Sequence, residues 1–191
     1  MTTLEGLVWF SLVLFMLHEF EEIILLKAWA IRYDAKIRSL WPKGKPFGLH
    51  FFDDVGYASA PITETAAVGI GLQFVLIALL TLLSVLFHYY LIWFAFMVLT
   101  PLTSLFLHLR VTIQFKGYSP GFVTAILTSL ATIWVLIRVY SMTSYGVWEL
   151  VIATVAVNVV LGFLAMKYMH RAATALSTRL RNYAGTTKKA D

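Results

Sequence analysis

The chain has 191 residues, of which 60% are hydrophobic and only 13% charged, with a mean hydropathy of +0.79. This balance excludes an ordinary soluble domain and indicates an integral membrane protein. Because the chain has no cysteine, disulfides, thiolate nucleophiles, iron–sulfur clusters and cysteine zinc sites are excluded, and His, Asp and Glu remain as ligands or acid–base groups. The formal charge is +5, but the basic residues flank apolar runs, so we expect membrane lipids and not nucleic acid as partners.

Five apolar stretches reach the roughly 20 residues that a helix needs to cross about 30 Å of hydrocarbon. In chain order they run from about Leu4 to Leu26, Thr65 to Phe87, Tyr89 to Leu109, Pro120 to Tyr140, and Gly146 to Met166. The sequence therefore predicts an all-α bundle of about five transmembrane helices, none of them clearly broken. We expect one transmembrane domain over residues 1–170 and a basic cytoplasmic tail over residues 171–191.

The basic residues predict the orientation of this bundle. Fourteen of the fifteen Lys and Arg residues follow the first, third or fifth stretch, and only Arg138 lies on the other side. The positive-inside rule then places the N-terminus outside and the C-terminus in the cytoplasm, in the plasma (cytoplasmic) membrane. After the first span, Trp29, Tyr33, Ile37 and Leu40 recur at near-helical spacing, which predicts an interfacial helix along the cytoplasmic surface.

The first span contains ionisable residues that do not belong in lipid, in the run His18-Glu19-Phe20-Glu21-Glu22. At 100° per residue, Glu21 and Glu22 flank His18 on one helix face, while Glu19 is expected to be solvated or to support the site. A charge at the centre of a span costs roughly 2.5–3.5 kcal/mol, so these carboxylates must be paired, protonated or close to an interface. Ionisable groups inside a membrane usually face a cavity and mark a functional site.

Helix length places further polar groups at the same depth. At 1.5 Å per residue, the motif lies about 21–27 Å from the outer start of span one, and His108 lies about 28 Å along span three. Span two begins just after Glu64, and we expect Ser119 to cap span four with Pro120 at its first position. We predict that His18, Glu21, Glu22 and His108 share one site, with Arg110 close enough to pair with a carboxylate. The loop sequence His50-Phe51-Phe52-Asp53-Asp54 repeats the spacing of the histidine and the two acidic residues in the first motif. Aspartate pairs in loops are commonly solvated, so we do not expect this sequence to join the site.

These residues resemble a known family, the HXXEE-motif family of small membrane proteins, whose pattern His18, Glu21 and Glu22 fit. A second block, with His108, the run Tyr118-Ser119-Pro120-Gly121 and the pair Thr124-Ala125, is similar to the family's downstream signature. The resemblance covers most of the chain, from span one through span four. It implies a multispanning membrane fold and a shared site, but no reaction, because the family has no established activity.

Three functions compete. In the first, His18, Glu21, Glu22 and His108 bind Zn, Fe or Mn in a membrane-embedded enzyme that acts on a lipid or other hydrophobic substrate, with Glu22 and Glu64 as catalytic groups. In the second, the same His and Glu residues perform metal-free acid–base chemistry, such as moving a double bond. In the third, the cluster binds a proton, cation or lipid headgroup without catalysis, and a homo-oligomer completes the protein. Metal content separates the first hypothesis from the other two.

Overall fold

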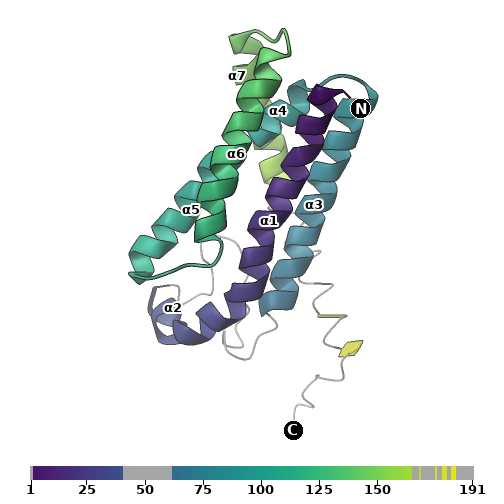
Figure 1. The fold of residues 1–191 in the computed structure, drawn as a ribbon. Coiled ribbons are helices and arrows are strands. Elements are labelled where there is room, and N and C mark those ends of the chain that lie inside the picture. Colours follow the sequence, from purple (N-terminus) through teal and green to yellow (C-terminus); the bar gives the residue numbers. More distant parts are fainter. Residues whose placement is uncertain are drawn as a thin grey trace.

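The computed structural model describes residues 2–40 and 62–164 and isolated residues between 168 and 183, apart from the side chains of residues 38, 62–66, 162 and 163. Throughout this described part the protein is helical, as predicted, and it has seven helices (Figure 1). They are α1 (Thr3–Arg32), α2 (Asp34–Leu40), α3 (Ile62–Leu86), α4 (Leu91–Met97), α5 (Thr100–Phe115), α6 (Phe122–Ser141) and α7 (Val147–Leu164).

Helix α1 is the centre of the bundle. It packs against α3 on one side and α6 on the other, while α5 packs against α6 and α4 against α7 (Figure 1). At its start, the Thr2 hydroxyl accepts the amide of Glu5 and the Glu5 carboxylate accepts the amide of Thr2, which satisfies two amides that a helix start leaves unpaired. With 30 residues α1 is about 45 Å long, so it extends beyond the predicted span.

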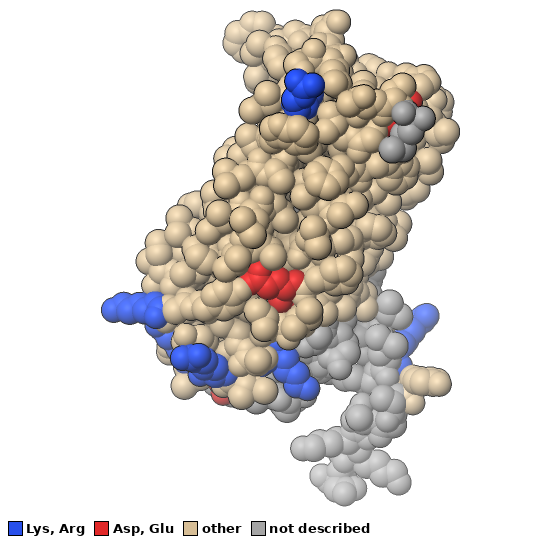
Figure 2. Space-filling model, viewed as in Figure 1, with Lys and Arg blue, Asp and Glu red and all other residues tan. Residues whose placement is uncertain are grey.

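The apolar helices indicate a membrane protein. Three described helical stretches are long and apolar enough to cross a bilayer: Ala67–Leu86, Leu91–Phe115 and Phe122–Ser141. In α7 the described apolar run, Val147–Leu161, is shorter than a full span. Figure 2 shows a surface dominated by uncharged residues, with the basic side chains gathered at the end that carries α2 and one basic group at the opposite end. The five-span count and the N-out orientation stay predictions.

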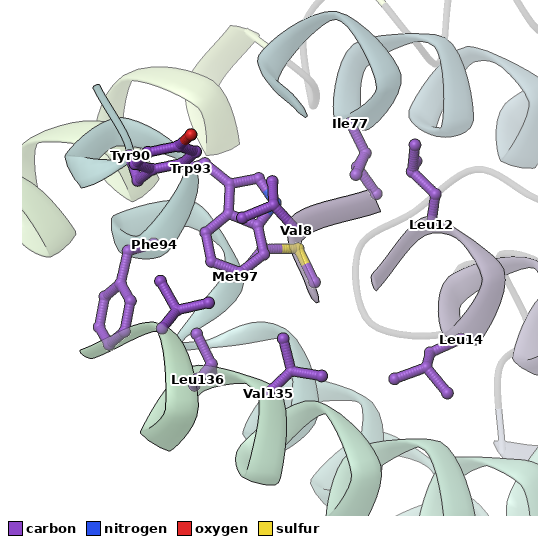
Figure 3. Packing of buried hydrophobic residues seen from close by; sticks show 11 residues of the cluster. Val8, Leu12, Leu14, Ile77, Tyr90, Trp93, Phe94, Met97, Val135 and Leu136 are labelled. Carbon is purple, nitrogen blue, oxygen red and sulfur yellow. The ribbon is translucent and has the colours of Figure 1, made fainter. Parts of the chain in front are cut away.

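The main core lies between the first half of α1 and the helices α3, α4 and α6. Val8 and Leu12 of α1 meet Ile77 of α3, Trp93 of α4 and Val135 of α6 (Figure 3). Asn158 of α7 donates a hydrogen bond of 2.8 Å to the carbonyl of Ala95 in α4, as expected of an amide between two helices. This core holds the ends of the helices remote from α2 and leaves the polar motif of α1 outside it.

The third apolar stretch contains a local interruption. Residues 98 and 99 form a turn that separates α4 from α5, but both keep right-handed helical backbone angles, so Leu91–Phe115 is still one stretch long enough to cross a bilayer. The cause is Pro101 near the start of α5, because a proline has no amide to donate and its ring clashes with the carbonyl four residues earlier, here that of Met97.

The predicted interfacial helix differs too. Residues 27–32 continue α1, and only the seven residues Asp34–Leu40 form the separate helix α2. Trp29 and Ile37, whose spacing led to that prediction, are buried with Phe115 at the end of α5, and Tyr33 lies beside them. The aromatic spacing therefore produces a contact between the ends of α1, α2 and α5. The loop with His50, Asp53 and Asp54 lies outside the described residues.

Candidate functional site

Three side chains from two helices converge near the end of the bundle that carries α2. His18 and Glu22 are one turn apart on α1, so they project from the same face, and His18 Nε2 lies 3.7 Å from Glu22 Oε1. His108 of α5 completes the group, with its Nε2 atom 2.9 Å from Glu22 Oε1 and 3.2 Å from His18 Nε2. We call His18, Glu22 and His108 the His/Glu cluster.

The spacing of these three atoms matches that of ligands around one metal ion. Bonds of about 2.0–2.1 Å to a tetrahedral ion place neighbouring ligand atoms roughly 3.3–3.4 Å apart. The three distances in the cluster, 2.9, 3.2 and 3.7 Å, lie on both sides of that value. Two imidazole nitrogens 3.2 Å apart cannot both carry a proton toward each other, so at least one lone pair points into the cluster. Without a metal, His108 Nε2–H can donate to Glu22 Oε1 at 2.9 Å or to His18 Nε2 at 3.2 Å.

Each histidine is held by hydroxyl groups. Ser104, one turn before His108 on α5, has its hydroxyl 3.1 Å from His18 Nε2. Thr124 of α6 has its hydroxyl 3.2 Å from His18 Nδ1. Behind His108, Ser119 donates a hydrogen bond of 3.3 Å to the His108 carbonyl and shares one of 2.8 Å with Thr112. The cluster is therefore fixed by α1, α5, α6 and the turn before α6.

That turn corrects the predicted start of span four. Helix α6 begins at Phe122, and Ser119 does not cap it, because the Ser119 side chain is buried against α5. The Phe122 amide donates to the Ser119 carbonyl, Pro120 follows Ser119, and Gly121 has φ +79° and ψ −6°. This is a type II turn, which accepts proline at its second position and needs glycine at its third. The turn presses Gly121 against Glu22 and His108.

Glu21 lies beside the cluster and not in it. Its Oε2 atom accepts a hydrogen bond of 2.9 Å from the amide of Thr124, at the start of α6. Its Oε1 atom is buried without a hydrogen-bond partner among the described residues. Of the four predicted metal ligands, the structure thus brings three together, His18, Glu22 and His108, and turns the fourth toward α6.

The remaining predicted residues have different positions. Glu19 is only 8% exposed, so the expectation that it is solvated is wrong. Arg110 and Tyr118 have exposed side chains. The backbone of Glu64 lies in the first turn of α3, but its side chain is outside the described part of the protein, so its proposed catalytic role stays a prediction.

The cluster is open toward the outside of the bundle. The Glu22 side chain is 28% exposed, whereas those of His18 and His108 are 10% and 12% exposed. In Figure 2 an acidic group reaches the surface within the uncharged belt, above the basic end and beside α1. The Glu22 side chain can therefore be reached from outside the bundle.

Sequence reasoning assigned no role to Ser104, Thr112 or Thr124, although all three contact the site. Spacing offered a signal for two of them, because Ser104 and Thr112 each lie one turn from His108 on α5. Thr124 belonged to the second block of the family resemblance, but no role was assigned to it.

Comparison with known proteins agrees with this geometry. A family described as protein of unknown function with HXXEE motif matches residues 9–135, which is more than half of the chain and includes all three members of the His/Glu cluster. No curated protein and no solved structure matches the chain. The chain therefore belongs to the HXXEE-motif family, whose function is unknown.

Proposed function

We propose that this protein is a membrane-embedded, metal-dependent enzyme that acts on a lipid or another hydrophobic substrate. The observation that supports it is the convergence of one carboxylate oxygen and two imidazole nitrogens at distances of 2.9–3.7 Å from one another. Two histidines and one carboxylate form a donor set that suits Zn, Fe or Mn.

The cluster leaves room for chemistry at the ion. Three protein ligands are fewer than the four of a closed structural zinc site, and a fourth position is what catalytic zinc sites keep for water or substrate. Bound there, a divalent ion supplies a Lewis acid that polarises a substrate oxygen or activates a water. His18, Glu22 and His108 would hold the ion, and Ser104 is the described hydroxyl closest to His18 Nε2.

The surroundings favour a hydrophobic substrate. The Glu22 side chain is partly exposed, and exposed apolar side chains of the same bundle include Ile24 of α1, two residues from Glu22, and Leu127 of α6. A substrate with an apolar chain would keep the chain in the leaflet while its polar group reaches the cluster. We propose that the protein lies in the plasma membrane, with the site in the cytoplasmic leaflet.

A second candidate is metal-free acid–base catalysis, such as the shift of a double bond. The direct contact of 2.9 Å between Glu22 and His108 favours it, because a proton can pass between a carboxylate and an imidazole at this distance.

Metal analysis of the detergent-purified protein tests the proposal. We expect one divalent ion for each wild-type chain, and none after His18→Ala or His108→Ala. Glu22→Gln and Glu21→Gln form a matched pair, because each removes one carboxylate charge from the same turn of α1 while an amide oxygen remains. Glu22→Gln should weaken metal binding, whereas Glu21→Gln should not, because an amide oxygen can still accept the Thr124 hydrogen bond.

A metal that stabilises the folded protein gives an independent measurement, since an ion at 100 times its Kd adds about 2.7 kcal/mol to the free energy of unfolding. If the wild-type protein neither contains Zn, Fe or Mn nor is stabilised by any of them, the metal proposal is wrong. The acid–base function or simple proton or lipid binding then replaces it.

A further inference from the structure

Thr124 connects α6 to two residues of the HXXEE motif at once. Its hydroxyl lies 3.2 Å from Nδ1 of His18, and its amide donates a hydrogen bond of 2.9 Å to Oε2 of Glu21. Among the described residues, Thr124 is the one that forms hydrogen bonds with both the His18 imidazole and the Glu21 carboxylate. Thr124 is therefore placed to control how the motif is oriented.

The direction of the Thr124 hydroxyl determines where the His18 proton lies. The hydroxyl oxygen is 3.2 Å from the Gly121 carbonyl and 3.4 Å from the His18 carbonyl, and both carbonyls can only accept. When the hydroxyl proton is directed to one of these carbonyls, the oxygen can accept a hydrogen bond from His18 Nδ1–H. A neutral imidazole protonated at Nδ1 has a bare Nε2.

The bare nitrogen faces the cluster. Nε2 of His18 lies 3.2 Å from Nε2 of His108, 3.1 Å from the Ser104 hydroxyl and 3.7 Å from Glu22 Oε1. A lone pair at this position is what a metal ligand requires, whereas the other tautomer would point a proton at the ion. In metal sites, the group that accepts the remote imidazole N–H fixes the ligand in this way, and its loss typically weakens metal affinity 10- to 100-fold.

Glu21 explains how Thr124 stays in place. The N-cap of α6 is Gly121, which has no side chain to accept the free amides of the first turn. Glu21, from α1, accepts the Thr124 amide in its stead, and a carboxylate there also interacts favourably with the positive end of the helix. Glu21, the first glutamate of the chain's HXXEE motif, thus holds the start of α6 against α1.

We propose that Thr124 is a positioning residue that keeps His18 in the Nδ1–H tautomer and so directs the Nε2 lone pair into the His/Glu cluster, with Glu21 anchoring Thr124. As an inference about metal affinity this rests on the proposed function, but the tautomer itself does not. The site therefore depends on a hydroxyl that is not a ligand.

Three variants test the proposal. Thr124→Val removes the hydroxyl with little change of shape, and Thr124→Ser keeps it. Thr128→Val is the matched control, because the Thr128 hydroxyl, one turn later on α6, donates a hydrogen bond to the Thr124 carbonyl and not to a residue of the motif. Each variant is compared with the wild type in zinc affinity, in thermal stability without metal, and in the ¹⁵N chemical shifts of the His18 ring, assigned through His18→Ala.

In the metal-free wild type we expect a protonated Nδ1 and a bare Nε2 at His18. Thr124→Val should lose that preference and bind zinc 10- to 100-fold more weakly. Thr124→Ser should restore both properties, and Thr128→Val should leave both unchanged.

The proposal is overturned if Thr124→Val keeps the wild-type tautomer, or if Thr124→Ser is no better than Thr124→Val. It is also overturned if Thr128→Val weakens zinc binding equally, since the effect would then come from α6 in general. If the wild type binds no metal but shows the Nδ1–H tautomer that Thr124→Val loses, the proposed function fails and the positioning role stands.

Discussion

Replacing Gly121 by alanine should damage the site and the fold together. Gly121 has φ +79°, a left-handed conformation that costs a residue with a Cβ atom roughly 1–2 kcal/mol. A Cβ built there would lie 2.7 Å from His108 Cε1, 2.8 Å from Glu22 Cγ and 3.0 Å from Glu22 Oε1. Both cluster members must therefore move, in addition to the backbone strain.

Gly71→Ala is the matched control. Gly71 lies inside α3, and a Cβ atom there would meet nothing within 4 Å among the described atoms. Alanine is favoured over glycine in a helix interior by about 1 kcal/mol, so this variant should be stabilised.

Unfolding in mixed micelles measures both variants, and zinc titration measures the site. We expect the free energy of unfolding to fall by at least about 1–2 kcal/mol in Gly121→Ala and to rise by up to about 1 kcal/mol in Gly71→Ala. Zinc affinity should fall only in Gly121→Ala. If Gly121→Ala is as stable as the wild type and binds zinc equally well, the close approach of the turn to Glu22 and His108 is not a feature of the protein.

Two further predictions concern the bundle. Asn158→Ala removes the hydrogen bond from α7 to the Ala95 carbonyl and should lower the free energy of unfolding by roughly 0.6–1.7 kcal/mol, measured in the same micelles; no loss would mean that this bond does not hold α7 to α4. Reporter fusions after residue 45 and after residue 180 should both report a cytoplasmic location, because the basic residues flank those positions, and an external location for both would reverse the predicted orientation.

Much of this architecture follows from helical periodicity and length. The apolar stretches predict the helical character of α3 and α6, and the spacing of four residues predicts that His18 and Glu22 share a face. The depth of His108 along the chain predicts its approach to α1, although only the packing of α1 and α5 on α6 makes the contact.

The predictions that differ from the structure share a physical origin, which is that neighbouring residues favour different local conformations. Ser119 and Pro120 form a good helix start by composition, but the following glycine allows a type II turn instead, and the Ser119 hydroxyl then finds partners on α5. Pro101 lies within a long apolar run, yet its missing amide interrupts the helix there. Residue type alone does not say which partner a hydroxyl or amide will find across the bundle.

The glutamates at positions 19, 21 and 22 of α1 show why counting charges is not enough to describe this motif. Rotation by 100° per residue sends them in different directions, so they do not share one environment. Glu22 meets His108 at 2.9 Å, Glu21 accepts an amide at the start of α6, and Glu19 is buried. Glu21 and Glu22 thus each have their own partner in an apolar setting. Consequently the two glutamates of the chain's HXXEE motif have separable roles, one within the cluster and one in holding the helix that orients it.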